Sequence, residues 1–336
     1  MATLAIVTKE TRLILKFGGL ALGLIIFIFL IFQGGVLLKN TFFPAPPAAP
    51  QEKFGKLTPI VFPQQSLGVP QFRVNTVSGT LPIFSSTIKV YKLQVLQPSI
   101  TALQAAKARA ASLGYTQNQQ AITADEYVWT LATANNTLRY NITSLNFSVS
   151  SDYLASPSPI GNVPDKSTLL TTVGNFIGAL GSNQSDVTMS NSIFSYYLVN
   201  NGTLTETPNV AAANAARVYL IQNPIDQIPI YYPGTNPSLL YFTLSGTNVV
   251  YASYIHFAPD LTSSSTYPLK TASAALADLS SGKGFIVSPT ADVTVDLTDV
   301  SLGYYVGGEQ NQTYLMPIVV FTGKNNFKAY VNALAD

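Results

Sequence analysis

The sequence predicts an α+β protein, with a single N-terminal membrane helix followed by exported modules of antiparallel sheet and single packed helices. Three observations indicate this class. Residues 17–38 form an uncharged apolar run. Three amphipathic stretches, each followed by a glycine, lie far apart along the rest of the chain, and short alternating segments separate them. Single helices among short strands favour α+β modules over a parallel doubly wound sheet.

Composition excludes several classes of protein. The 336 residues are 47% hydrophobic and only 10% charged, against about 25% charged in an average protein. There is no cysteine, and His256 is the only histidine, so a disulfide scaffold, a Cys-ligated zinc site, a thiol nucleophile and a His-rich metal site are excluded. A net charge of +2 argues against a nucleic-acid partner. We expect no cofactor.

The apolar run FGGLALGLIIFIFLIFQGGVLL is the predicted transmembrane helix. Residues 17–38 would extend about 33 Å as a helix, enough for a hydrocarbon core of about 30 Å. A cleaved signal peptide is the alternative, but its apolar region is usually only about 7–15 residues long. Basic residues flank both ends equally, so charge does not fix the orientation. The short basic tail of residues 1–16 resembles a signal anchor, so we place it in the cytoplasm and residues 39–336 outside.

Gly19 and Gly23 form a G-x-x-x-G pair within this run. Small residues at that spacing let a second helix approach closely, which predicts a contact with the membrane helix of a partner. Ordinary glycine in a membrane span is the alternative interpretation.

The exported part is predicted as a linker and two modules. Prolines make residues 39–70 an extended spacer, and we expect ordered structure from about Phe72. Module 1 covers residues 71–155 and module 2 residues 156–336. Predicted helices cover residues 100–113, 165–180 and 271–279. The predicted strands include residues 126–131 and 217–222 and a meander of residues 229–232, 239–245 and 248–257. The repeated order of helix, Leu-Gly and strand pair indicates a weak internal duplication.

The last 70 residues carry a resemblance to a known family. The segments are YPLKTASAAL from Tyr267, SGKGF from Ser281, VSLGYY from Val300, YLMPIVVF from Tyr314 and AYVNAL from Ala329. Residues 265–334 look like the C-terminal module of bacterial YycH/YycI-type and related PepSY-like extracytoplasmic proteins. The resemblance implies one membrane helix, an exported α+β region and regulation of a membrane histidine kinase by contact. It implies no catalytic residues.

Candidate chemistry is weak. Ser280 and Lys283 match the S-x-x-K pattern of penicillin-recognising serine enzymes, but the pattern closes a helix here instead of opening one. Asp292, Asp296 and Asp299 surround a strand-like segment and do not form a tight calcium loop. His256 lies in an apolar run, which favours a hydrogen-bonded sheet residue over a pH switch.

Asp125 and Glu126 lie near Trp129 in the sequence, but their spacing does not indicate general acid–base catalysis. The sequence therefore predicts no enzyme, no catalytic residue and no metal site. Two functions compete. The first is a membrane-anchored protein that regulates or scaffolds a membrane partner such as a sensor kinase. The alternative is a cell-envelope module whose tyrosines hold wall polymer or glycan.

Overall fold

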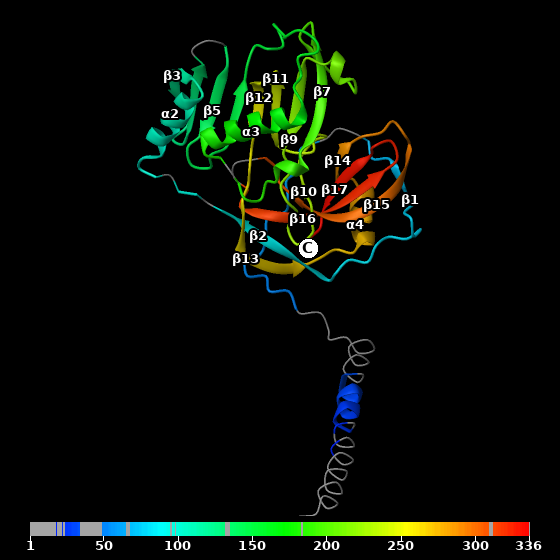
Figure 1. The fold of residues 1–336 in the computed structure, drawn as a ribbon. Helices are drawn as coiled ribbons and strands as arrows, with labels where there is room; N and C mark the ends of the chain where they lie inside the picture. Colours follow the sequence, from blue (N-terminus) through cyan, green and yellow to red (C-terminus); the bar gives the residue numbers. More distant parts are fainter. Residues whose placement is uncertain are drawn as a thin grey trace, which may run out of the picture. The chain divides into compact units, whose positions relative to one another are not determined.

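The computed structural model describes residues 18, 22, 24–33, 49–64, 68–94, 96–97, 99–131, 135–182, 184–308 and 312–335 (Figure 1). The chain divides into two units, residues 1–49 and residues 50–336, and the second unit is the body of the protein. In the first unit, residues 24–33 are helical, and the large apolar side chains of residues 24–32 are 52–69% exposed. Within the described residues, no helix is long and apolar enough to cross a membrane.

The body is mixed α+β, as the sequence predicts. Its helices are α2 (Ala102–Ser112), α3 (Lys166–Leu180) and α4 (Ala272–Ser280), with short 3₁₀ turns η1 (Met189–Asn191) and η2 (Val210–Ala212). Its strands are β1 (Gln71–Val74), β2 (Thr87–Leu93), β3 (Tyr115–Ala121), β4 (Glu126–Leu131), β5 (Thr137–Asn141), β6 (Phe147–Ser150), β7 (Ile193–Asn200), β8 (Thr203–Glu206), β9 (Ala215–Tyr219), β10 (Ile230–Tyr231), β11 (Leu240–Ser245), β12 (Asn248–Tyr254), β13 (Pro259–Pro268), β14 (Phe285–Ser288), β15 (Thr294–Tyr305), β16 (Tyr314–Gly323) and β17 (Lys328–Asn332).

The first of the two sheets that the described residues form has nine strands, in the order β3-β4-β5-β6-β12-β11-β9-β7-β8. All neighbours are antiparallel. Helices α2 and α3 pack on one face (Figure 1). Large aromatic side chains fill the core beneath them because alternate residues of each strand point to the same face. These rings are Trp129, Tyr140, Phe147, Phe242 and Tyr254, and α3 adds Leu169, Phe176 and Ile177.

Helix α3 begins and ends where the sequence predicts. Asp165 caps it, accepting a hydrogen bond of 3.0 Å from the Thr168 amide, as short polar side chains do at helix starts. Gly181 ends it with φ +68°, a conformation that favours glycine. A Cβ at Gly181 would also lie 2.8 Å from the Arg109 guanidinium carbon. Arg109 thus lies against the carboxyl end of α3, where a cation is favourable.

The second sheet has eight strands. Its main path is β1-β15-β16-β17-β14, while β2 joins β16 to β13 and β10 pairs with β15. Strands β1 and β10 run parallel to β15, and the other pairs are antiparallel. Helix α4 packs on this sheet through Ala272, Ala275 and Leu279, against a core that includes Val319, Phe321 and Val331.

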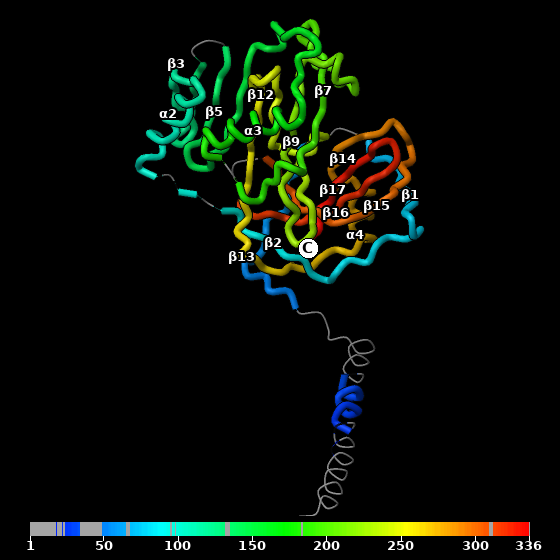
Figure 2. Tube along the Cα trace, viewed as in Figure 1, coloured from blue at the N-terminus to red at the C-terminus, as the bar shows by residue number. Residues whose placement is uncertain are grey.

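The nine-stranded sheet is an insertion into the eight-stranded sheet. Strand β2 ends at Leu93, which pairs with Pro259 at the start of β13, and all nine strands of the first sheet come from the chain between them. Figure 2 shows β2 and β13 side by side where the chain leaves and returns. Strand β10 makes a third connection between the inserted chain and the eight-stranded sheet, because it pairs with β15. The Tyr231 ring of β10 lies so close to Gly303 of β15 that a Cβ at residue 303 would overlap the ring.

The sequence predicts ordered structure from about Phe72, but in the structure it begins earlier. Residues 50–62, called the strap below, pack along the eight-stranded sheet with Phe54, Ile60 and Phe62 against its buried residues. The spacer interpretation considered only the prolines, whereas the apolar side chains of the segment pack against the sheet.

The sheets also take strands from both sides of the predicted module boundary at residue 155. Strands β1 and β2 of predicted module 1 lie in the eight-stranded sheet with the C-terminal strands. Helix α2 of predicted module 1 and helix α3 of predicted module 2 both pack on the nine-stranded sheet. The module bounds and the internal duplication remain predictions.

Candidate functional site

The face of the nine-stranded sheet opposite α2 and α3, called the outer face below, carries a cluster of tyrosines around one arginine. On β9, Ala216 and Val218 enter the core with the helices, so Arg217 and Tyr219 point to the outer face by alternation. Strands β7 and β11 flank β9. They bring Tyr197 and Tyr241 to either side of Arg217.

The Arg217 guanidinium lies between two rings, 5.0 Å from the centroid of Tyr197 and 5.0 Å from that of Tyr241. Its Nε donates a 2.9 Å hydrogen bond to Thr243 Oγ1, and Nη1 donates a long one of 3.5 Å to the Tyr219 hydroxyl. Burial raises the pKa of Tyr197 to about 12, so this phenol stays neutral beside the cation. Such cation–π contacts stabilise by about 0.5–2 kcal/mol each.

A polar groove of about 780 Å³ lies where the loop 151–158 meets β12 and α3. Ser, Thr and Asn side chains make up half of its lining residues, and Asp152 is the one carboxylate among them. The Asp152 carboxylate accepts a 2.9 Å hydrogen bond from Asn135. The rings of Tyr115, Tyr153 and Phe176 also line the groove, but each is buried. A groove rich in hydroxyl and amide groups complements a polyhydroxylated ligand.

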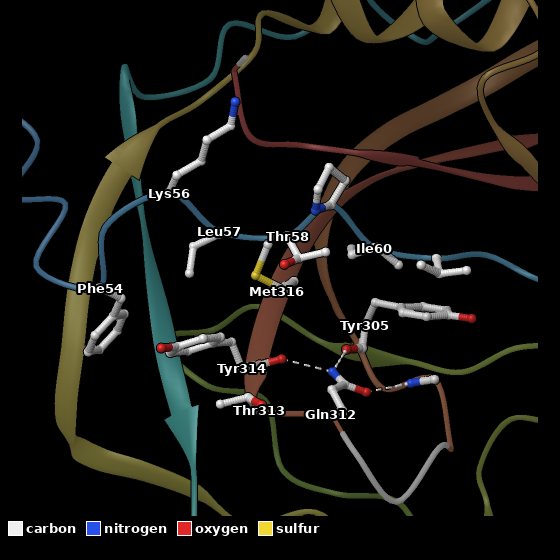
Figure 3. Close-up of a pocket in the computed structure, with 13 residues that line it drawn as sticks. Phe54, Lys56, Leu57, Thr58, Ile60, Tyr305, Gln312, Thr313, Tyr314 and Met316 are labelled. Carbon is white, nitrogen blue, oxygen red and sulfur yellow. Dashed lines mark hydrogen bonds between the residues drawn. The ribbon is translucent and has the colours of Figure 1, made fainter.

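A second cavity, of about 400 Å³, lies between the strap and strands β15 and β16 (Figure 3). Leu57 and Thr58 of the strap line one side, and Tyr305, Tyr314 and Met316 line the other. Gln312 fixes the edge of the cavity, since its side chain donates to the carbonyls of Tyr305 and Tyr314 at 2.8 and 2.9 Å. The cavity therefore exists only while the strap is packed on the sheet.

A buried polar network lies at the junction of the two sheets. His256 Nε2 lies 2.8 Å from Asp186 Oδ1, and the amide of Gln222 donates a 3.0 Å bond to Asp186 Oδ2. The Tyr232 hydroxyl donates to Gln222 at 3.0 Å. Burial acts to raise the pKa of Asp186, but the hydrogen bonds from His256 and Gln222 outweigh it, so the net shift is downward. The His256 side chain is only 3% exposed, which suits a structural histidine.

The structure separates the residues of the weak motifs. Ser280 donates to the Leu276 carbonyl within α4, and the Lys283 ammonium lies 3.4 Å from Asp278, so the two do not form a nucleophile–base pair. Asp296 pairs with Arg73 and Lys324. Among the described residues, no group of three His, Cys, Asp or Glu side chains could hold a metal ion. Gly19 and Gly23 lie outside the described residues, as does much of the predicted membrane span 17–38.

The tyrosines do not form an exposed surface. Twelve of the eighteen are buried and the other six are half-buried. Trp129 is 1% exposed, so it is not available for stacking on a ligand. The only concentration of aromatic rings around a cation on the outer face is the Arg217 cluster, within the part of the chain that is described.

No family model, curated protein or solved structure matches the chain. The resemblance of residues 265–334 to YycH/YycI-type proteins therefore stays a prediction. Sequence reasoning missed Arg217, the groove and the strap cavity. Arg217 begins a predicted strand, but nothing near it in the sequence indicates which rings its neighbouring strands bring to it.

Proposed function

We propose that the protein is a non-catalytic, membrane-anchored protein whose extracytoplasmic body acts by contact with a membrane partner, such as a sensor histidine kinase. The apolar run of residues 17–38 supports the anchor. Its described residues 24–33 are helical, with apolar side chains exposed all along. A helix that is apolar all round suits a lipid environment. The proposal includes the bilayer and the partner, and no nucleic acid or cofactor.

The strap is the observation that carries this proposal. It packs on the body from residue 50 onward, so only residues 39–49 separate the body from the predicted span. Twelve chain steps from residue 38 to residue 50 extend at most about 40 Å. The body is therefore held within reach of the extracytoplasmic part of a neighbouring membrane protein.

Two measurements test this proposal on the full chain. We expect protease added to intact cells to cleave the body. We also expect Gly19→Leu together with Gly23→Leu to weaken recovery of the cross-linked partner in detergent, because the larger side chains block close helix approach. Gly34→Leu with Gly35→Leu is the matched control, since this pair lacks the four-residue spacing. Protection of the body from protease contradicts the proposal, and equal recovery with both pairs removes the helix contact from it.

The polar groove favours a second candidate function, binding of envelope glycan. The hydroxyl and amide side chains that make up half of its lining residues fit a sugar. We expect the full chain to be retained on purified envelope polymer, and Asn175→Ala with Asn248→Ala to reduce retention. Gln120→Ala, at an exposed position of β3, is the control. Retention unchanged by the groove substitutions contradicts this candidate.

A further inference from the structure

We propose that two copies of this chain associate through the outer face of the nine-stranded sheet, with Arg217 of each copy bound to Glu206 of the other. The inference goes beyond the proposed function and does not rest on it. It depends on three observations: an arginine with unused donors, a carboxylate on the same face that also lacks a partner, and the scarcity of charge on the strands around them.

The first observation is that the Arg217 guanidinium is fixed in place but not neutralised. It lies between the rings of Tyr197 and Tyr241, and its Nε donates to Thr243. Its one terminal acceptor among the described residues is the Tyr219 hydroxyl, at 3.5 Å, and no described carboxylate lies within ion-pair distance. A guanidinium has five N–H donors, so most of its terminal fork remains available to a carboxylate.

The second observation is Glu206, which is the complementary group on the same face. It lies directly opposite Tyr197 in the β7–β8 pair, and Leu204, two residues earlier, packs with Tyr197 and Ala215. The Glu206 side chain therefore points to the outer face by alternation. It is exposed, and it makes no hydrogen bond or ion pair within the described part of the chain. Strand β7 lies between β8 and β9, so about 10 Å of sheet separates Glu206 from Arg217.

The third observation is how few charges the sheet carries. Its nine strands hold only four charged side chains, which are Glu126, Arg139, Glu206 and Arg217. Arg139 and Glu126 neutralise each other through two hydrogen bonds of 2.7 and 2.6 Å. One unpaired cation and one unpaired anion are left, on a face of half-buried hydroxyl side chains that include Ser195, Tyr241 and Ser253. Protein interfaces are depleted of charge at their centre and enriched in tyrosine and arginine.

These observations favour a second copy as the partner because twofold symmetry satisfies both groups at once. In a symmetric dimer, a contact from one residue to another is repeated in the opposite direction. A twofold axis that runs between the two faces, over the middle of β7, brings each Arg217 to the Glu206 of the other copy. A half-buried cation without an anion is costly, and this contact would compensate it. An unrelated partner would have to supply an acid and a base at the same spacing.

The size of the face sets the expected strength of the dimer. Strands about 4.8 Å apart make the sheet about 40 Å wide, and strands of this length extend about 20 Å. The face therefore approaches the area of about 800 Å² per partner that a standard interface buries. The loop 151–158 covers one end of it, where Tyr153 packs with Val199 and Ala215. We therefore expect a dimer with a Kd in the micromolar range.

The test is sedimentation equilibrium of the full chain in a density-matched detergent. We expect a dimer, and Glu206→Arg should raise its Kd by roughly 100-fold, because symmetry counts twice a loss of about 10-fold for each charge-assisted pair. Adding Arg217→Glu to Glu206→Arg should restore association. Arg217→Glu alone also removes the ring contacts of the cation, so the exposed Glu206 is the better single position. Lys107→Glu, at an exposed position of α2, is the matched control and should leave the Kd unchanged.

A cross-link locates the contact. The chain has no cysteine, so Ser195→Cys places a single thiol on the outer face of β7. Packed sheets lie about 10 Å apart, so a short bismaleimide should join two copies at this position. Thr205→Cys lies on β8 and points to the opposite face by alternation, so it should not cross-link.

Four results would overturn the proposal. They are a monomer at every concentration, a dimer that Glu206→Arg leaves unchanged, a dimer that only Gly19→Leu with Gly23→Leu abolishes, and cross-linking at residue 205 instead of residue 195. The third result would assign association to the membrane helix, and the fourth would assign it to edge-to-edge pairing of β8.

Discussion

Replacing Phe62 by alanine should release the strap without unfolding the body. The Phe62 ring stacks on Phe285 at 5.6 Å and meets Tyr305 edge-on at 5.2 Å. Removing a fully buried phenylalanine costs about 3–5 kcal/mol. Phe62 is half-buried, so we expect a loss of about 2 kcal/mol of strap packing. That loss raises the population with the strap released by roughly 30-fold.

Hydrogen exchange measures this release. The amides of residues 51–54 donate to Thr266, Ser265 and Tyr267 of β13, so they exchange only when the strap opens. We expect their exchange to accelerate in Phe62→Ala, while the β11 amides keep their rate. Val61→Ala is the control, since Val61 is 79% exposed. Unchanged exchange at residues 51–54 would refute the strap as one cooperative segment, and equal acceleration in β11 would refute local release.

Three further predictions concern the body. Gly303→Ala should lower the unfolding free energy by about 1–3 kcal/mol in a denaturant titration, because the added Cβ would lie 2.6 Å from Cε2 of Tyr231; an unchanged midpoint would contradict the close packing of β10 on β15. Thr271→Ala should cost about 1 kcal/mol of thermal stability, since the hydroxyl caps α4, and Thr271→Ser should restore it. Burial acts to raise the folded-state pKa of Asp186, but the interactions with His256 and Gln222 outweigh it and lower that pKa. The stabilising contribution of Asp186 is therefore complete above the unfolded pKa of about 3.9 and is lost as pH falls through the folded pKa. Asp186→Asn should flatten the acid limb of a stability–pH profile, and an unchanged slope would contradict the network.

Local signals predicted the helices because their ends depend on neighbouring residues. Asp165 and Gly181 mark the ends of α3 by capping and by a positive φ, and both can be identified from the sequence alone. Strand β4, Glu126–Leu131, was likewise predicted to its exact ends. Strands β3 and β13 were missed. Strand β3 is a polar edge strand whose residues after Tyr115 are all exposed, and β13 is rich in Ser and Thr between two prolines, so neither has an apolar alternation to detect.

Long-range pairing limited the prediction of the site. The predicted meander joins residues 229–232 to β11 and β12, but β10 pairs in parallel with β15 instead. The Arg217 cluster combines side chains from β7, β9 and β11, which are neighbours in the sheet although β8 and β10 separate them in the chain. Hydrophobic pattern reports which face a residue occupies, and it carries no information on which strand becomes its neighbour.

The pairing of β1 with β15 and of β2 with β13 has a consequence for biosynthesis. Gln71 aligns with Thr294 and Leu93 with Pro259, so strands β1 and β2, which are translated early, find their partners only when residues far downstream have emerged. The inserted nine-stranded sheet draws on residues up to Tyr254, and can complete itself earlier. During synthesis the chain therefore carries a finished insertion beside unpaired strands and an unpacked strap, and a chaperone that shields bare strand edges would act at this stage.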